Sequence, residues 1–178
     1  IFFSEEKIIA KNLKAQWLGG NIQINSDTQL PWQKLSYMNV SGSANFTDAI
    51  ALTGSDNTNS ALLKQIDGRF DYSGKLSAGA KGYDLNLDLK IDPMSSQLPA
   101  PFNKKAGQSM SAQFLLNGTN KDTTFEHTGY LKIGKLLEIK FAANQQQDLR
   151  VAYGINTVAM LPTEGTAANL VFDSIDLD

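Results

Sequence analysis

The feature that most constrains the fold is an alternation of apolar and polar residues along much of the chain. Its clearest stretch is Tyr83-Asp84-Leu85-Asn86-Leu87-Asp88-Leu89-Lys90-Ile91. Successive side chains of a β-strand point to opposite faces, whereas a helix of this sequence would scatter its apolar residues around the whole circumference. The pattern therefore predicts a strand with one apolar face and one polar face.

The same alternation recurs along the chain and predicts about ten strands joined by short turns. The other strands are expected near residues 9–17, 22–24, 38–46, 70–78, 110–116, 125–133, 137–143, 149–155 and 170–177. Gly19-Gly20, Gly79 to Gly82 and Gly134-Lys135 indicate turns between them, and Asn117-Gly118 is typical of a hairpin turn. The expected fold class is all-β and mainly antiparallel, a meander that curls into a sheet.

Two stretches interrupt the alternation. Residues 61–66 have helical spacing and follow the capping residues Asn57 to Ser60, so we expect one short helix there, with a turn near residues 47–52. Residues 93–107 contain three prolines, which have no N–H to donate to a central ladder, so this stretch is predicted to be a Pro-rich loop.

The composition argues against catalysis. The chain has no cysteine, one histidine (His127), 16 basic and 18 acidic residues. These counts exclude thiol chemistry and disulfide frameworks, and they offer no basic excess for nucleic acid. Asp84 and Asp88 lie about 13 Å apart on the polar face of one strand, so they form no acid–base pair. We expect no enzyme, no cofactor and no metal site.

The apolar faces need a partner, because the sequence predicts too little helix to cover them. They could meet a second sheet, close into a barrel, or form an open trough around a ligand. These folds correspond to three functions: an interaction module built as a β-sandwich, a barrel carrier of a small hydrophobic molecule, and lipid transport along a groove. His127 and Lys11 are the main polar residues on the inward rows. A groove would be lined by Phe70, Tyr72, Leu76, Tyr83, Leu85, Leu87, Leu89, Ile91, Met110, Phe114, Leu116, Phe125, Leu131, Ile133, Ile139, Phe141, Val151 and Tyr153.

Two segments carry a resemblance to a known family. Leu98-Pro99-Ala100-Pro101-Phe102-Asn103-Lys104 resembles a distinctive segment of the YhdP branch of the AsmA-like family, and residues 61–74 are similar to that family's short helix and following strand. The resemblance is best over residues 36–145. It implies a U-shaped repeating β-groove in a periplasmic protein that is anchored in the inner membrane and moves phospholipid toward the outer membrane of a Gram-negative bacterium, with no catalytic residues.

The resemblance also implies the chain's place in a larger protein. Residues 1–178 are expected to form a single β-groove segment of a longer protein, with neighbouring groove repeats, phospholipid acyl chains and, through the full-length protein, both membranes as partners. Leu98 and Phe102 are large apolar residues in a segment that cannot join the ladder, which leaves two interpretations open: they plug or cap the groove, or they pack locally in a surface loop.

Overall fold

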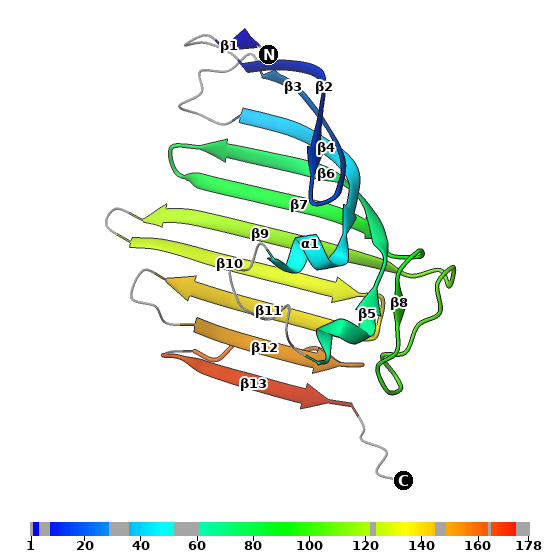
Figure 1. Ribbon diagram of the computed structural model, residues 1–178. Coiled ribbons are helices and arrows are strands. Elements are labelled where there is room, and N and C mark those ends of the chain that lie inside the picture. Colours follow the sequence, from blue (N-terminus) through cyan, green and yellow to red (C-terminus); the bar gives the residue numbers. More distant parts are fainter. Residues whose placement is uncertain are drawn as a thin grey trace.

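One large open sheet dominates the computed structural model, which describes residues 2–3, 8–28, 36–51, 61–121, 124–144, 149–163 and 165–173 (Figure 1). Its eleven strands follow the chain in the order β1-β2-β3-β4-β6-β7-β9-β10-β11-β12-β13, and β5 and β8 form a separate pair. The strands are β1 (Phe2–Phe3), β2 (Ile8–Trp17), β3 (Gly20–Thr28), β4 (Ser36–Asn45), β5 (Ile66–Asp67), β6 (Arg69–Gly79), β7 (Gly82–Lys90), β8 (Ser95–Ser96), β9 (Ser111–Lys121), β10 (Thr124–Ile133), β11 (Leu137–Asn144), β12 (Leu149–Ile155) and β13 (Ala167–Phe172).

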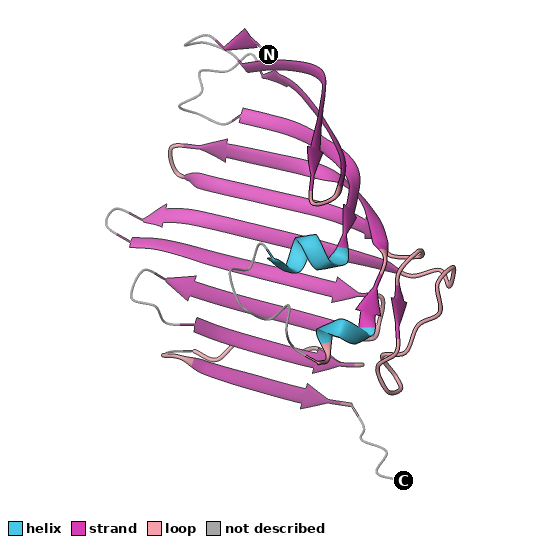
Figure 2. Ribbon diagram, in the orientation of Figure 1, coloured by secondary structure: helices cyan, strands magenta, loops and turns pink. Residues whose placement is uncertain are grey.

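The sheet is antiparallel from β1 to β12, as the alternation and turns predict. It does not close into a barrel, because β1 and β13 lie at opposite ends of the order. Figure 2 shows the strands curling together, with the short helix on the concave side. The mainly antiparallel, curled all-β fold is thus confirmed, and the barrel alternative is wrong.

The last strand departs from a plain meander, because β13 pairs with β12 in parallel. Parallel neighbours need a connection that crosses one face of the sheet. Here residues 156–163 run across the convex face. Lys140 Nζ donates to the carbonyl oxygen of Ala159 (3.1 Å), and Asn169 Nδ2 donates to that of Met160 (3.0 Å). The concave face of β11–β13 is therefore left clear of this connection.

The helical segment differs from the prediction. The α-helix is α1 (Phe46–Ala51), where only a turn was expected, and residues 61–66 form a turn and the 3₁₀ helix η2 (Leu63–Gln65). Helix cannot continue through Ile66, because this residue is extended and pairs with Ser96 of β8. The predicted capping residues 57–60 lie outside the described residues.

The hairpin turn predicted at Asn117-Gly118 is also wrong. Strand β9 runs through both residues as far as Lys121. Gly118 pairs with Tyr83 on one side and His127 on the other, and a Cβ atom at Gly118 would collide with the Tyr83 ring. This glycine serves close packing within the sheet rather than a turn.

A buried polar cluster stabilises the convex face beneath the crossover. Glu138 is 8% exposed and accepts a hydrogen bond from the Tyr130 hydroxyl (3.1 Å), while its Oε1 lies 2.8 Å from Lys140 Nζ. The hydrogen bond from Lys140 is the largest cause that lowers the pKa of Glu138; burial opposes it, and Tyr130 and the charges of Lys140 and Lys132 add smaller lowering effects. The folded state therefore favours the ionised carboxylate.

Because of this cluster, the stability of the fold is expected to depend on pH in the acidic range. A carboxyl whose folded pKa is depressed stabilises the fold above its unfolded pKa, and the contribution is lost as the pH falls through the folded value. We expect urea denaturation to show a steeper loss of stability below about pH 4 in the wild type than in Glu138→Gln. Equal slopes for the two proteins would contradict the assignment. Asp88→Asn, an exposed carboxyl on the same face, is the matched control and should keep the wild-type slope.

Candidate functional site

The candidate site is the concave face of the large sheet, because the strand register aligns apolar side chains into continuous rows. Directly paired residues of neighbouring strands project to the same face. One such row crosses ten strands through Leu13, Ile24, Val40, Gly74, Leu87, Phe114, Leu131, Ile139, Tyr153 and Leu170. Nine strand spacings of ~4.8 Å make this row about 43 Å long.

Two more apolar rows run beside the first. The row on the side of the β6–β7 turn contains Met38, Leu76, Leu85, Leu116, Gly129, Phe141, Val151 and Ala168. The row on the other side contains Ala15, Ile22, Gly42, Tyr72, Leu89, Ala112, Ile133, Leu137, Ile155 and Phe172. Together the rows form an apolar band across the curled sheet.

The register therefore places most residues of the predicted lining on one face. Phe70, Ile91 and Met110 continue the alternation at the ends of their strands, and the Ile91 amide donates to the Met110 carbonyl (3.1 Å). The side chain of Phe125 lies outside the described part of the structure. Lys11 lies in a β-bulge between Ala10 and Leu13, outside the regular pairing of the rows.

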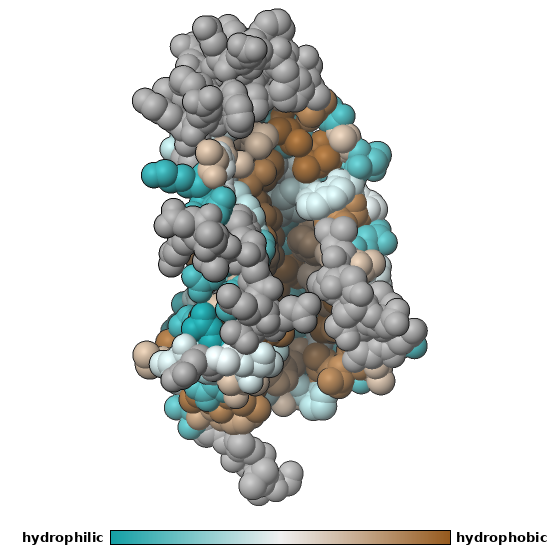
Figure 3. Space-filling view, turned by 90° about the vertical axis from the view of Figure 1, so that its left-hand side faces the viewer, coloured by the Kyte–Doolittle hydropathy of each residue, from teal (hydrophilic) through white to brown (hydrophobic). Residues whose placement is uncertain are grey.

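No second layer covers this face among the described residues. The buried hydrophobic residues on this face are Ala10, Ala44, Tyr72 and Ala112, and no large side chain among the described residues is fully buried. Leu85, Leu87, Leu89 and Phe114 are only half-buried, whereas a sandwich would bury such residues in its core. Figure 3 shows the result as an apolar strip that runs along a hollow between more polar walls.

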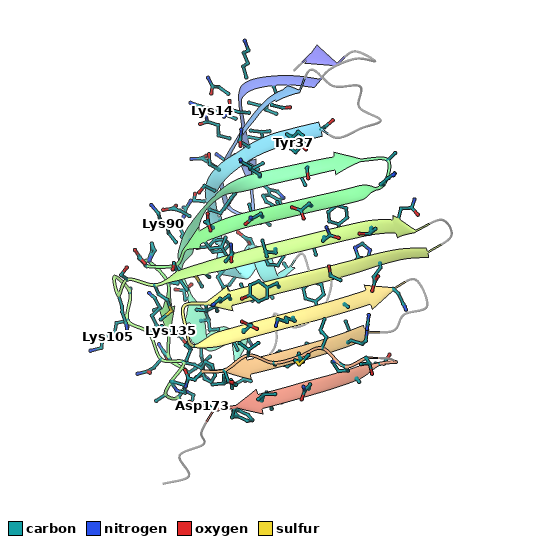
Figure 4. The ribbon with its side chains drawn as sticks, turned by 180° about the vertical axis from the view of Figure 1, so that it is seen from behind. Lys14, Tyr37, Lys90, Lys105, Lys135 and Asp173 are labelled. Carbon is teal, nitrogen blue, oxygen red and sulfur yellow. The ribbon has the colours of Figure 1, made fainter. Side chains whose placement is uncertain are left out.

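The convex face has the opposite character. The residues that alternate with the apolar rows are mostly polar, as in Asp84, Asn86, Asp88 and Lys90 of β7, which are all exposed. Figure 4 shows the molecule from behind, and Lys14 and Lys90 lie on the outside of the curl. The convex face of the sheet is thus polar and in contact with water, whereas the concave face is an uncovered apolar surface.

Two glycines on the concave face leave room for aromatic rings from neighbouring strands. A Cβ atom at Gly129 would overlap the ring of Phe141, and one at Gly118 would overlap the ring of Tyr83. Each ring therefore lies across the backbone of its glycine neighbour on the next strand. These positions could not be recognised from the apolar–polar alternation, because a glycine contributes nothing to it.

Gly129→Ala is expected to destabilise the fold by about 1–3 kcal/mol, because Phe141 must leave its position over the strand. Thermal unfolding should then begin a few degrees lower than in the wild type. The double variant Gly129→Ala/Phe141→Leu should recover part of the loss, since leucine has no ring to displace. Strictly additive effects of the two substitutions would contradict this packing.

A fourth row lies nearer the β6–β7 turn and is less uniformly apolar. It contains Ala78, Tyr83, Gly118, His127, Ala143 and Leu149. The Tyr83 hydroxyl lies 2.8 Å from His127 Nδ1, and the two ring centroids are 6.0 Å apart. Burial raises the pKa of Tyr83, so its hydroxyl stays protonated at neutral pH. This pair is a polar point on the margin of an otherwise apolar surface.

The Pro-rich loop is held together by a buried lysine. Lys104 is 9% exposed, and its ammonium group donates to the carbonyl oxygens of Asp92 (2.9 Å), Met94 (2.8 Å) and Lys105 (3.4 Å). The backbone of Lys104 also exchanges two hydrogen bonds with Ser96. The lysine that ends the Leu98–Lys104 segment therefore has a structural role in this chain.

The loop lies beside the strand ends toward which the sheet bends (Figure 1). Leu98 and Phe102 are both half-buried within it. Their predicted role as a plug of the groove stays a prediction.

A separate cavity of about 260 Å³ lies between α1 and the segment η2–β5. Phe46, Ile50, Leu63 and Ile66 supply its apolar lining, and Thr47, Lys64 and Asp67 its polar lining. The amide of Phe46 donates to the carbonyl of Gly68 (3.1 Å), which fixes the start of α1 against the chain entering β6. The sequence did not indicate this cavity.

Reactive groups are sparse within the described ranges. They contain no group of three or more residues suited to holding a metal ion. No described helix is both long and apolar enough to span a membrane. The arrangement offers an extended apolar surface.

An open sheet with uncovered apolar rows along its concave side defines a β-groove protein. The profile of the family described as YhdP protein matches residues 1–178, and the chain therefore belongs to the YhdP family. The resemblance found in residues 61–74 and 98–104 is thereby confirmed. Comparison with curated proteins and comparison with solved structures gave no match.

Proposed function

We propose that this chain forms part of a passive conduit for phospholipid between the inner and outer membranes of a Gram-negative bacterium. The acyl chains would lie on the apolar rows of the concave face, in a protein that works in the periplasm and is anchored in the inner membrane. Membership of the YhdP family supports this assignment. The structural observation that carries it is the uncovered apolar band across the sheet.

The energetics of transfer suit such a conduit. Burying one CH₂ group contributes about 0.8 kcal/mol, so an acyl chain of ~16 carbons gains on the order of 13 kcal/mol over water. The rows offer a similar apolar surface at each strand, which lets a lipid move sideways without leaving that environment. No chemical step is required, and the transport is non-enzymatic.

The geometry of the sheet also supports a larger assembly. A sheet of this span cannot cross a cell envelope, so neighbouring groove repeats of the same protein would continue the path. The edge strand β13 presents Leu170 and Phe172, which are 56% and 39% exposed, at the end of two apolar rows. An open sheet edge of this kind accepts a further strand through its backbone groups.

Native mass spectrometry of the chain purified from a Gram-negative host tests the proposal, and co-purified phospholipid is the expected result. A photo-crosslinking amino acid at Leu87 or Phe114 should capture lipid. The same probe at Asn86 or Gln113, their neighbours on the convex face, is the matched control and should not. Absence of phospholipid together with no crosslink at either concave position would refute the proposal.

A further inference from the structure

The polar pair on the margin of the groove suggests where a lipid's polar end would lie. Tyr83 is the second residue of β7, directly after the turn at Ala80-Lys81, and its partner Ala78 stands just before that turn. The row through Tyr83 and His127 is therefore the outermost of the four described rows on this side of the groove. Both side chains are half-buried, so each contacts the apolar surface and remains within reach of solvent.

The depth of the groove matches an acyl chain that starts at this row. Tyr83 and Leu89 are six residues apart along β7, which corresponds to about 20 Å at ~3.3 Å per residue. Half of the ~30 Å hydrocarbon core of a bilayer, about 15 Å, is the depth that one acyl layer occupies. A lipid whose polar end lies at Tyr83 can therefore place its acyl chains entirely against Leu85, Leu87 and Leu89.

The chemistry of the pair suits oxygen-rich anionic groups. When the Tyr83 hydroxyl donates to His127 Nδ1, the neutral imidazole carries its proton on Nε2, which makes that nitrogen a donor. Lys81 adds an exposed ammonium in the adjacent turn, and its carbonyl is fixed by the Asn120 amide (2.9 Å). A hydrogen bond from such donors to a phosphate oxygen is stronger than one to a neutral oxygen.

We infer that Tyr83 and His127, with Lys81 beside them, form a contact site for the phosphate of a glycerophospholipid that is seated in the groove. The inference rests on the proposed lipid transport and adds a headgroup preference to it. Tyr72 provides the contrast on the same face. Its ring packs against Trp17 and Phe70, its hydroxyl is buried without a hydrogen-bond partner among the described residues, and at 5% exposure it is closed to a headgroup.

Competition between two lipids with identical acyl chains tests the site. The 178-residue chain is loaded with an equimolar mixture of dioleoylphosphatidylglycerol and dioleoylglycerol, which lacks the phosphate, and the bound ratio is read by native mass spectrometry. Wild type should prefer the phospholipid by about tenfold, the value of one charge-assisted hydrogen bond. The variant Tyr83→Phe/His127→Phe should lose most of that preference, so that the two lipids are bound in nearly equal amounts. Tyr37→Phe, the same chemical change on the exposed convex face, should keep it.

The single histidine of the chain gives a second readout, because its imidazole signals in NMR need no assignment. The His127 signals should shift when dioleoylphosphatidylglycerol is bound and stay unchanged with inorganic phosphate at the same concentration. An equal shift with inorganic phosphate would overturn the lipid assignment. A preference retained in Tyr83→Phe/His127→Phe, or absent from a wild type that loads both lipids, would overturn the headgroup site and leave the conduit intact. Failure of the wild type to load either lipid would overturn both.

Discussion

Leu87→Asp is expected to remove lipid loading from the chain. Leu87 lies in the row that crosses ten strands, paired with Gly74 on one side and Phe114 on the other. No cation projects from these two partners, so an acyl chain at this point would have to pass an unpaired carboxylate. Burying an unpaired charge costs several kcal/mol, which corresponds to a loss of at least about a hundredfold in occupancy. Native mass spectrometry of the purified variant should detect no phospholipid above background.

The neighbouring residue on the opposite face provides the control. Asn86→Asp introduces the same charge one position away, on the exposed convex face, and should load lipid as the wild type does. Leu87→Ala keeps the row apolar and separates a folding defect from a block, because it loses packing without adding charge. Circular dichroism should show that all three variants retain the sheet. A folded Leu87→Asp chain that carries phospholipid at the wild-type level would contradict the assignment of this face.

Lys104→Met is expected to give the largest loss of stability away from the groove. Methionine keeps an unbranched apolar stem but leaves the carbonyl oxygens of Asp92, Met94 and Lys105 without their donor. Hydrogen bonds to charged groups contribute about 1.5–3 kcal/mol each, and part of this is offset by the cost of burying the ammonium group. We expect a net loss of about 2–4 kcal/mol, and a midpoint of thermal unfolding about 5–15 °C lower.

Lys105→Met tests whether the loss of stability in Lys104→Met comes from removing the buried ammonium group of Lys104. Lys105 is exposed, and its contribution to the loop is made by its backbone. Its replacement should change stability by no more than about 0.5 kcal/mol. Equal losses in the two variants would show that the loop is held by general charge rather than by the three carbonyl bonds.

The alternation in the sequence was enough to predict the apolar face, because successive side chains of a strand point to opposite faces of the sheet. Leu85, Leu87 and Leu89 must share a face once β7 is extended, and a shift of one residue in its pairing would expose all three on the polar side. The family resemblance in residues 98–104 was also visible, although the reason for its lysine was not. That reason depends on carbonyl groups up to 12 residues away, whose positions only the folded loop defines.

Features fixed by distant contacts could not be predicted. Ile66 is extended because Ser96 lies beside it, and no local pattern announces that pairing. The parallel placement of β13 is equally hidden, because the residues of a parallel and an antiparallel edge strand alternate in the same way. The Tyr83–His127 contact joins residues 44 positions apart across an intervening strand. Its partners were visible in the sequence, but their proximity was not.

The side on which the crossover between β12 and β13 lies affects the width of the groove at β11–β13. A connection of this length laid over the concave side would narrow the passage at β11–β13, and the narrowest cross-section limits what a conduit can carry. Arg150 instead holds the crossover on the outside through the carbonyl oxygens of Pro162 (3.4 Å) and Thr163 (3.1 Å). The crossover therefore adds a second layer on the convex side of the sheet near its β13 edge and leaves the concave side open.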